Sequence, residues 1–154
     1  MPRRPITGET PLTKNEIGRH GVPPWVPSVV HDLTSDLSDN PPSVDFVPVV
    51  FEDTFGGRYF PRLNAILVYE TRSSDPQSDT RLNLATLIHE IGHWRSYMDK
   101  CGTPGGRSSC GYHGDHDSTF YRILAPMYRR FSVQPEEIKI VEGNYDYPNS
   151  LLGR

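Results

Sequence analysis

The feature that most constrains this 154-residue chain is a helical pattern over residues 80–101. Apolar side chains recur there at spacings of three and four, which is typical of one broad buried helix face. Ser78, Asp79 and Thr80 offer capping oxygens at its start, and Gly102 is a helix stop. The apolar stripe consists of Leu84, Leu87, Ile88, Ile91, Trp94 and Met98. We therefore predict a long, largely buried helix over this range.

This helix contains the segment His-Glu-Ile-Gly-His at residues 89–93. Side chains four residues apart lie on nearly the same helix face, about 6 Å apart along the axis, so His89 and His93 can reach one zinc ion. Glu90 lies beside the first ligand and can act as a general base toward a water that the metal activates. Two imidazoles beside an apolar surface would be costly without a ligand. The motif therefore predicts a catalytic Zn²⁺ site.

A third protein ligand is expected downstream, because a catalytic zinc usually has three protein ligands and a water. His116 is the first candidate, since a further helix is predicted to begin near Asp117. Loop 102–114 holds five glycines, which would let the chain return to the metal. The downstream side chains that could serve are His113, Asp115, His116, Asp117, Glu136 and Glu137.

The motif at 89–93, a later histidine at a helix start and Phe120 four residues after that histidine resemble the SprT-like (Spartan-type) zinc metallopeptidases. The resemblance covers roughly residues 46–131. It implies that Phe120 packs the helix that begins near Asp117 against the helix that carries the motif. In related zincins a strand before the metal helix lines the substrate cleft, which implies that role for residues 64–69.

The resemblance also implies the site. Its ligands would be His89, His93 and His116, with Glu90 as general base. The Gly-His-Trp ending of the motif is similar to the peptidase-like domain of antirestriction proteins of the ArdC type. We therefore expect a zinc metallopeptidase that acts on a protein or peptide substrate. The alternative is a non-catalytic binding or regulatory protein on a zincin scaffold.

The remaining pattern predicts an α+β fold, with a small twisted sheet of about three strands packed against the motif helix and a second, ligand-bearing helix. Residues 1–24 are expected to be a flexible arm and residues 25–154 a single domain. The expected elements are a helix from about 25 to 39, strands at 46–51 and 64–69 with a turn at Gly56-Gly57, a loop at 71–78, a helix from 117 to 131, and a short helix or strand around 138–141.

Composition narrows the class of protein further. A formal net charge of -3 and a pI near 6.0 argue against a dedicated nucleic-acid binder, which usually has a basic face. No apolar run approaches the roughly 18 residues that span a membrane, and no apolar segment follows the basic N-terminus as in a secretory signal. Two cysteines, Cys101 and Cys110, are too few for a disulfide scaffold. We expect a cytoplasmic protein with free thiols, a Cys101–Cys110 disulfide being the alternative.

Lesser candidates surround the predicted site. Tyr97, Tyr112 and Tyr121 could donate to a developing oxyanion, and the sequence does not choose among them. His113 could polarise a substrate carbonyl.

Overall fold

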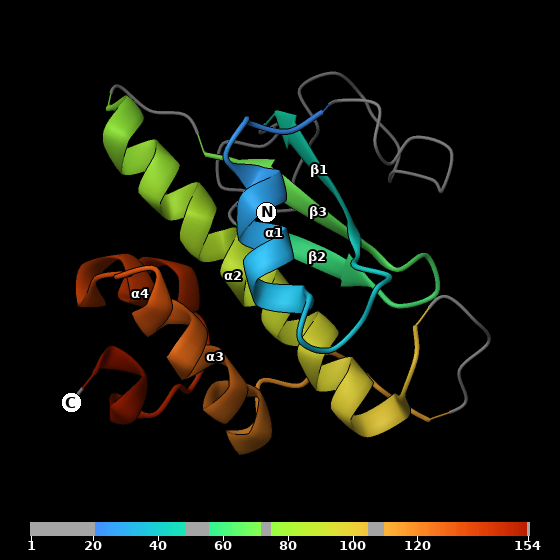
Figure 1. Ribbon diagram of the computed structural model, residues 1–154. Helices are drawn as coiled ribbons and strands as arrows, with labels where there is room; N and C mark the ends of the chain where they lie inside the picture. Colours follow the sequence, from blue (N-terminus) through green and yellow to red (C-terminus); the bar gives the residue numbers. More distant parts are fainter. Residues whose placement is uncertain (1–20, 49–55, 72–74, 105–109, 154) are drawn as a thin grey trace, which may run out of the picture.

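A computed structural model describes residues 21–48, 56–71, 75–104 and 110–153 (Figure 1). Its elements are α1 (Val26–Thr34), β1 (Ser43–Pro48), β2 (Gly57–Phe60), β3 (Ala65–Glu70), α2 (Pro76–Cys101), α3 (Ser118–Arg130), α4 (Pro135–Glu142) and the short 3-10 helix η1 (Asn149–Leu152). Over these described ranges the chain combines four α-helices with a three-stranded sheet, which confirms the predicted α+β class.

The sheet has the strand order β1-β3-β2, with β1 parallel and β2 antiparallel to β3. β3 confirms the strand predicted at 64–69. The strand predicted at 46–51 begins earlier, at Ser43, and its last three residues lie outside the described ranges. The sequence allows either a hairpin or neighbouring strands here, and the two strands are parallel neighbours. Gly57, for which the sequence predicts a turn, instead begins β2 and pairs with Val68.

β3 occupies the centre of the sheet because its side chains are apolar on both faces. Ala65, Ile66, Leu67 and Val68 are all nearly inaccessible to solvent. Such a continuous apolar run is typical of a strand that is covered on both faces, whereas side chains alternate in a strand with one face in solvent. β2 lies at the edge of the sheet and runs beside α2.

α2 begins earlier than the sequence predicts. The Asp75 carboxylate caps it and accepts hydrogen bonds from the backbone N–H groups of Gln77 and Ser78, at 3.1 and 3.5 Å. Proline is well suited to the first helical turn, where its missing N–H costs nothing. The predicted loop at 71–78 is therefore wrong from Pro76 onward. The predicted end is confirmed, because Gly102 follows with a φ of 82°, in the region that favours glycine.

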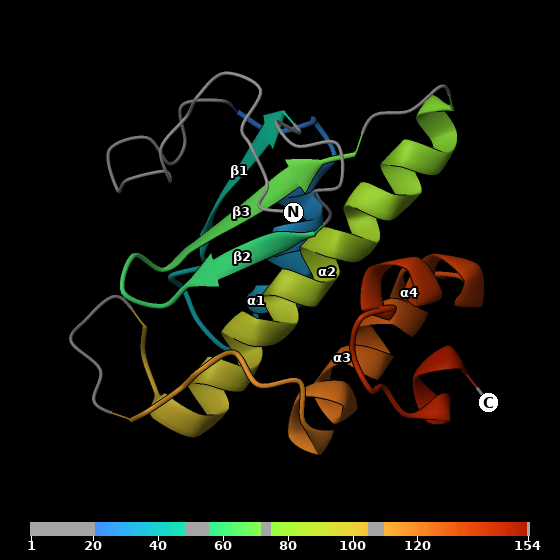
Figure 2. The ribbon, with the colours of Figure 1, turned by 180° about the vertical axis from the view of Figure 1, so that it is seen from behind.

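α2 is the central element of the fold. Both views show the sheet on one side of it and α3 and α4 on the other (Figures 1 and 2). Every residue from Asn83 to Trp94 is buried in α2, and the apolar ones join a core that extends from α1 to α4. The predicted buried stripe is confirmed, and burial includes both histidines and Glu90 of the motif.

The outer helices follow their predicted patterns with some differences. α3 is confirmed, with Pro126 inside it and Asp117 as its N-cap: the carboxylate accepts from the Phe120 N–H at 2.9 Å. Residues 138–141 are helical, within α4. α1 ends at Thr34 and not near residue 39, so Leu37 lies beyond it with 45% of its surface exposed.

Two further predictions concern the chain ends and the cysteines. Most of the expected arm at 1–24 lies outside the described residues, whereas Gly21 lies beside β1, where its carbonyl accepts from the Phe46 N–H at 3.1 Å. Cys101 and Cys110 form a disulfide, so the expectation of free thiols is wrong. The pairing removes the argument that the cysteines gave for a reducing compartment. Among the described helices, none has the length and apolar character needed to cross a membrane.

Candidate metal centre

Three histidines from two parts of the chain meet at one point. His89 and His93 lie on α2, and His116 immediately precedes the N-cap of α3. The Nε2 atom of His116 lies 3.0 Å from Nε2 of His89 and 3.2 Å from Nε2 of His93. One ligand atom from each of the three rings lies within 4.8 Å of the other two. The cluster therefore contains the three histidines named by the sequence pattern.

The donor set fits a zinc ion. Zinc binds histidine nitrogens at about 2.0–2.1 Å in a tetrahedral arrangement, which separates two ligand nitrogens by about 3.3 Å. The two measured Nε2–Nε2 distances, 3.0 and 3.2 Å, are close to that value. Three protein nitrogens also leave one tetrahedral position for a water or a substrate oxygen, as in catalytic zinc sites.

The other candidate ligands occupy different places. Asp117 caps α3 and forms an ion pair with Lys100 at 2.8 Å. Glu137 forms an ion pair with Arg81 at 3.2 Å. His113 lines the cavity beside the cluster but is not part of it. Of the predicted alternatives, the structure thus brings His116 to the two motif histidines.

Phe120 holds the second helix at the cluster. Its side chain is fully buried, stacks on the His93 ring at 4.4 Å between centroids and meets the His89 ring edge-on at 5.1 Å. Gly92 supplies the space, because a Cβ atom there would lie 3.1 Å from Phe120 Cε1. The packing role that the resemblance implied for Phe120 is confirmed, and the glycine of the motif is explained by the same contact.

Burial keeps two of the imidazoles neutral. Removal from water and the neighbouring His89 lower the pKa of His93 to about 2 and that of His116 to about 4. Burial also acts to lower the pKa of His89, but the hydrogen bond and charge of Glu142 outweigh it and raise the pKa. Neutral imidazoles have the free lone pair that a metal requires.

Each α2 histidine has a partner on its second ring nitrogen. His89 Nδ1 lies 2.5 Å from Glu142 Oε2, and the Tyr128 hydroxyl donates to the same oxygen at 2.7 Å. His93 Nδ1 lies 2.8 Å from the Tyr112 hydroxyl oxygen. Both rings are thereby fixed with Nε2 directed at the cluster. Such outer contacts orient the ligands of known metal sites.

Glu142 is not among the site residues that the sequence predicts, because it lies 53 residues after His89. One signal was present in the sequence. Glu142 lies four residues after Ile138 and so falls on the apolar face of the short helix around 138–141, where both side chains are buried. A carboxylate on a buried helix face requires a polar partner, which here is a metal-ligand candidate.

Glu90 faces a cavity of about 420 Å³ beside the three histidines. Glu90 is only 4% exposed, and burial raises the pKa of its carboxyl group to about 7, while His89 acts to lower this pKa and Glu142 to raise it. A carboxyl group with a pKa near neutrality can both accept and return a proton. The other residues that line the cavity are Gly57, Arg58, Tyr59, Pro61, Tyr112, His113, Gly114 and Tyr145.

The strand beside this cavity is β2 and not the segment 64–69 that the resemblance implied. Gly57, Arg58 and Tyr59 line the cavity, whereas β3 is paired on both sides and lies behind β2. The strand was missed because it is only four residues long and opens with glycine, which weakens any strand pattern.

The tyrosines are distributed unequally around the cavity. Tyr112 lines it, whereas Tyr97 and Tyr121 are buried in the core and do not. Tyr145, which sequence analysis did not single out, also lines it and stacks on His116 at 3.7 Å between ring centroids. Tyr145 is 41% exposed, so it covers the solvent side of the cluster.

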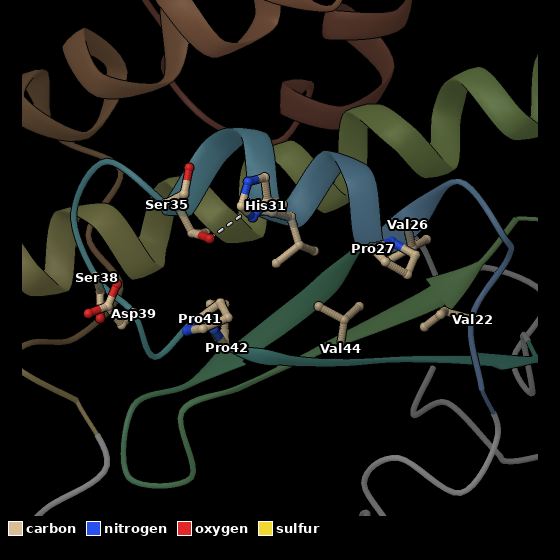
Figure 3. A pocket seen from close by; sticks show the side chains of 12 residues that line it. Val22, Val26, Pro27, His31, Ser35, Ser38, Asp39, Pro41, Pro42 and Val44 are labelled. Carbon is tan, nitrogen blue, oxygen red and sulfur yellow. Dashed lines mark hydrogen bonds between the residues drawn. The ribbon is translucent and has the colours of Figure 1, made fainter.

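A second cavity of about 470 Å³ lies between α1 and β1 (Figure 3). Its walls are mainly valine and proline side chains, including Val26 of α1 and Val44 of β1. Its titratable side chains are His31 and Asp39, and none of the three clustered histidines lines it. The chemistry of the described residues is therefore concentrated at the histidine cluster.

Comparisons with protein-family models, with curated proteins and with solved structures find no match to this chain. The histidine cluster, its buried carboxylate and the adjoining cavity are therefore the features from which a function has to be argued.

Proposed function

We propose that this chain is a zinc-dependent peptidase, in which His89, His93 and His116 hold the metal and Glu90 is the general base. The observation that carries the proposal is the convergence of three imidazoles beside a buried carboxyl group at one cavity. A purely structural zinc site would have four protein ligands and no use for Glu90.

The chemistry follows from the positions of these side chains. A zinc ion held by the three imidazoles would supply Lewis acidity, for both water and a substrate carbonyl. Glu90 takes the proton of the attacking water on a carboxylate oxygen and returns it to the leaving amine nitrogen. Its pKa of about 7 suits both transfers. Tyr112 and Tyr145, which stacks on His116, form part of the cavity wall around these groups.

The edge strand favours a peptide as the substrate. Within the described residues β2 pairs on one side only, and it lines the cavity next to Glu90. An extended peptide can align with such an edge through main-chain hydrogen bonds, which depend little on side-chain identity. This arrangement supports peptide-bond hydrolysis over hydrolysis of another bond at the same metal.

The test compares E90Q with wild type and with the control E136Q, which changes an exposed carboxylate on α4 in the same way. We expect E90Q to fold and to bind one zinc ion, but to cleave peptides about 10²- to 10⁴-fold more slowly. Cleavage is measured on a quenched-fluorescence peptide library, and zinc by elemental analysis. Wild-type cleavage by E90Q would contradict the mechanism.

A second arm separates metal binding from catalysis. H116A should lose zinc affinity, whereas H113A, three residues away and outside the cluster, should retain it. If the wild-type protein binds zinc but cleaves no peptide in the library, the chain is instead a binding module on this scaffold.

A further inference from the structure

We infer that Glu142 is a positioning residue of the metal centre, which fixes the orientation of His89 while Tyr128 holds the carboxylate. The inference rests on the metal site of the proposed function but not on peptide hydrolysis. It makes α4, which contributes no ligand to the cluster, a part of the metal site.

The geometry places Glu142 behind the ligand and not at the metal position. Oε2 of Glu142 lies 2.5 Å from Nδ1 of His89, whereas Nε2 of the same ring lies 3.0 Å from Nε2 of His116. The two nitrogens lie on opposite sides of the imidazole, so the carboxylate and the cluster face different edges. An ionised carboxylate oxygen only accepts hydrogen bonds, so Nδ1 of His89 carries a proton, and in the neutral ring the lone pair then lies on Nε2. That is the tautomer that a ligand requires.

The surroundings of Glu142 indicate that it is held for this contact. Its side chain is fully buried, and its Oε2 receives two hydrogen bonds, from His89 and from the Tyr128 hydroxyl. An apolar side chain of similar size would fill such a position without the cost of burying a carboxylate. Packing alone therefore does not account for a glutamate here.

The same helix provides a matched control. Glu137 of α4 also binds α2, through an ion pair with Arg81 at 3.2 Å, but it does not touch a ligand of the cluster. Both carboxylates therefore fasten α4 to α2, and only one of them contacts a histidine of the site. If these carboxylates only dock α4 on α2, replacing either one should weaken zinc binding equally. If Glu142 positions His89, only its replacement should do so.

The experiment measures zinc affinity by chelator competition for full-length wild type, E142Q, E137Q and Y128F. Loss of a partner behind a metal-bound histidine typically weakens metal binding by roughly 10- to 100-fold, which we expect for E142Q. E137Q should bind zinc as wild type does, and Y128F should show a smaller loss than E142Q. Long-range ¹H–¹⁵N spectra of the histidine rings should show a proton on His89 Nδ1 in the zinc-loaded wild type, with a shift that changes in E142Q.

Three results would overturn the inference. Wild-type zinc affinity in folded E142Q would show that the contact is dispensable. Equal losses in E142Q and E137Q would reduce Glu142 to a docking residue of α4. If E142Q does not fold, the wild-type spectrum decides, and a His89 without a proton on Nδ1 would exclude the proposed contact. Absence of peptidase activity with the expected zinc affinities would contradict the proposed function and leave this inference standing.

Discussion

Gly57 of β2 lies so close to Glu90 of α2 that a Cβ atom on residue 57 would be 3.1 Å from Glu90 Cγ. The same Cβ would also meet the Leu67 carbonyl oxygen of the neighbouring strand. The edge strand and the proposed general base are thus in direct contact. A side chain at position 57 would displace one of them.

G57A is therefore expected to lower both stability and activity. The added methyl group can be accommodated only by a shift of β2, because one of its contacts is backbone. Overpacking of this kind costs about 1–3 kcal/mol. Chemical denaturation measures the loss, and peptide cleavage by the folded fraction measures the effect on Glu90. An unchanged unfolding free energy would mean that the two elements separate easily.

Gly92 and Phe120 provide a second prediction. A Gly-to-Ala change in a helix interior normally stabilises by about 1 kcal/mol. In G92A the new Cβ would lie 3.1 Å from the Phe120 ring, which stacks on His93 and has little room to move. We expect a lower melting temperature in place of the usual gain. The double variant G92A/F120L should recover part of the loss, since the shorter side chain relieves the contact.

Y112F is expected to weaken zinc binding by roughly tenfold. The Tyr112 oxygen lies 2.8 Å from His93 Nδ1, and its hydroxyl donates to the His93 carbonyl oxygen at 3.3 Å. Without it, the ring of His93 loses the partner that fixes its orientation. Y97F is the control, because the Tyr97 ring packs against Tyr112 but has no role in holding His93. Chelator competition compares the two variants, and equal affinities would argue against this contact.

The disulfide predicts a dependence of stability on thiol reagents. Cys101 and Cys110 are nine residues apart, and closing a loop of that length stabilises a fold by about 2–3 kcal/mol. Dithiothreitol should lower the melting temperature of wild type. C101S and C110S should both match the reduced protein and should not respond to the reagent. If dithiothreitol leaves the wild-type melting temperature unchanged, the bond does not stabilise the native state.

Asp36 and Arg95 predict an acid-dependent contribution to stability. Hydrogen bonding to Arg95, at 3.0 Å, holds the pKa of Asp36 below its ordinary value of 3.8. The ionised carboxylate is favoured in the folded state, so its stabilisation is complete above that value and is lost as the pH falls through the lower, folded value. D36N keeps an acceptor but not the charge. The difference in unfolding free energy between D36N and wild type should be about 0.2–1 kcal/mol near neutral pH and should disappear in acid. A difference that persists in acid would contradict the assignment.

Local sequence pattern was sufficient for much of the fold. The long helix is predicted by the spacing of its apolar side chains, which recur every three or four residues. The spacing of His89 and His93 then places both on one face of that helix, and Gly102 marks its end. The sequence predicts the start of α2 too late, because Asp75-Pro76 is compatible with both a turn and a capped helix. Nothing local distinguishes these two outcomes. The choice depends on how the first turns of α2 pack in the folded chain.

The parts of the fold and of the site that the sequence does not predict are determined by distant contacts. β2 is a strand because Gly57 pairs with Val68 and passes close to Glu90, and neither contact leaves a pattern in four residues. Glu142 contacts His89 because α4 packs on α2. The convergence of His116 was predictable through a motif, whereas the residues that support the ligands were not.

The separation of 53 residues between His89 and Glu142 also has a consequence for the order of events during translation. At about 5–20 residues per second, the ribosome adds Glu142 roughly 3–10 s after His89. During that interval the motif histidines already exist, while the carboxylate that orients one of them does not. A metal ion captured early would meet a poorly oriented ligand set. The contact that orients His89 can therefore form only after the chain has been synthesised as far as Glu142.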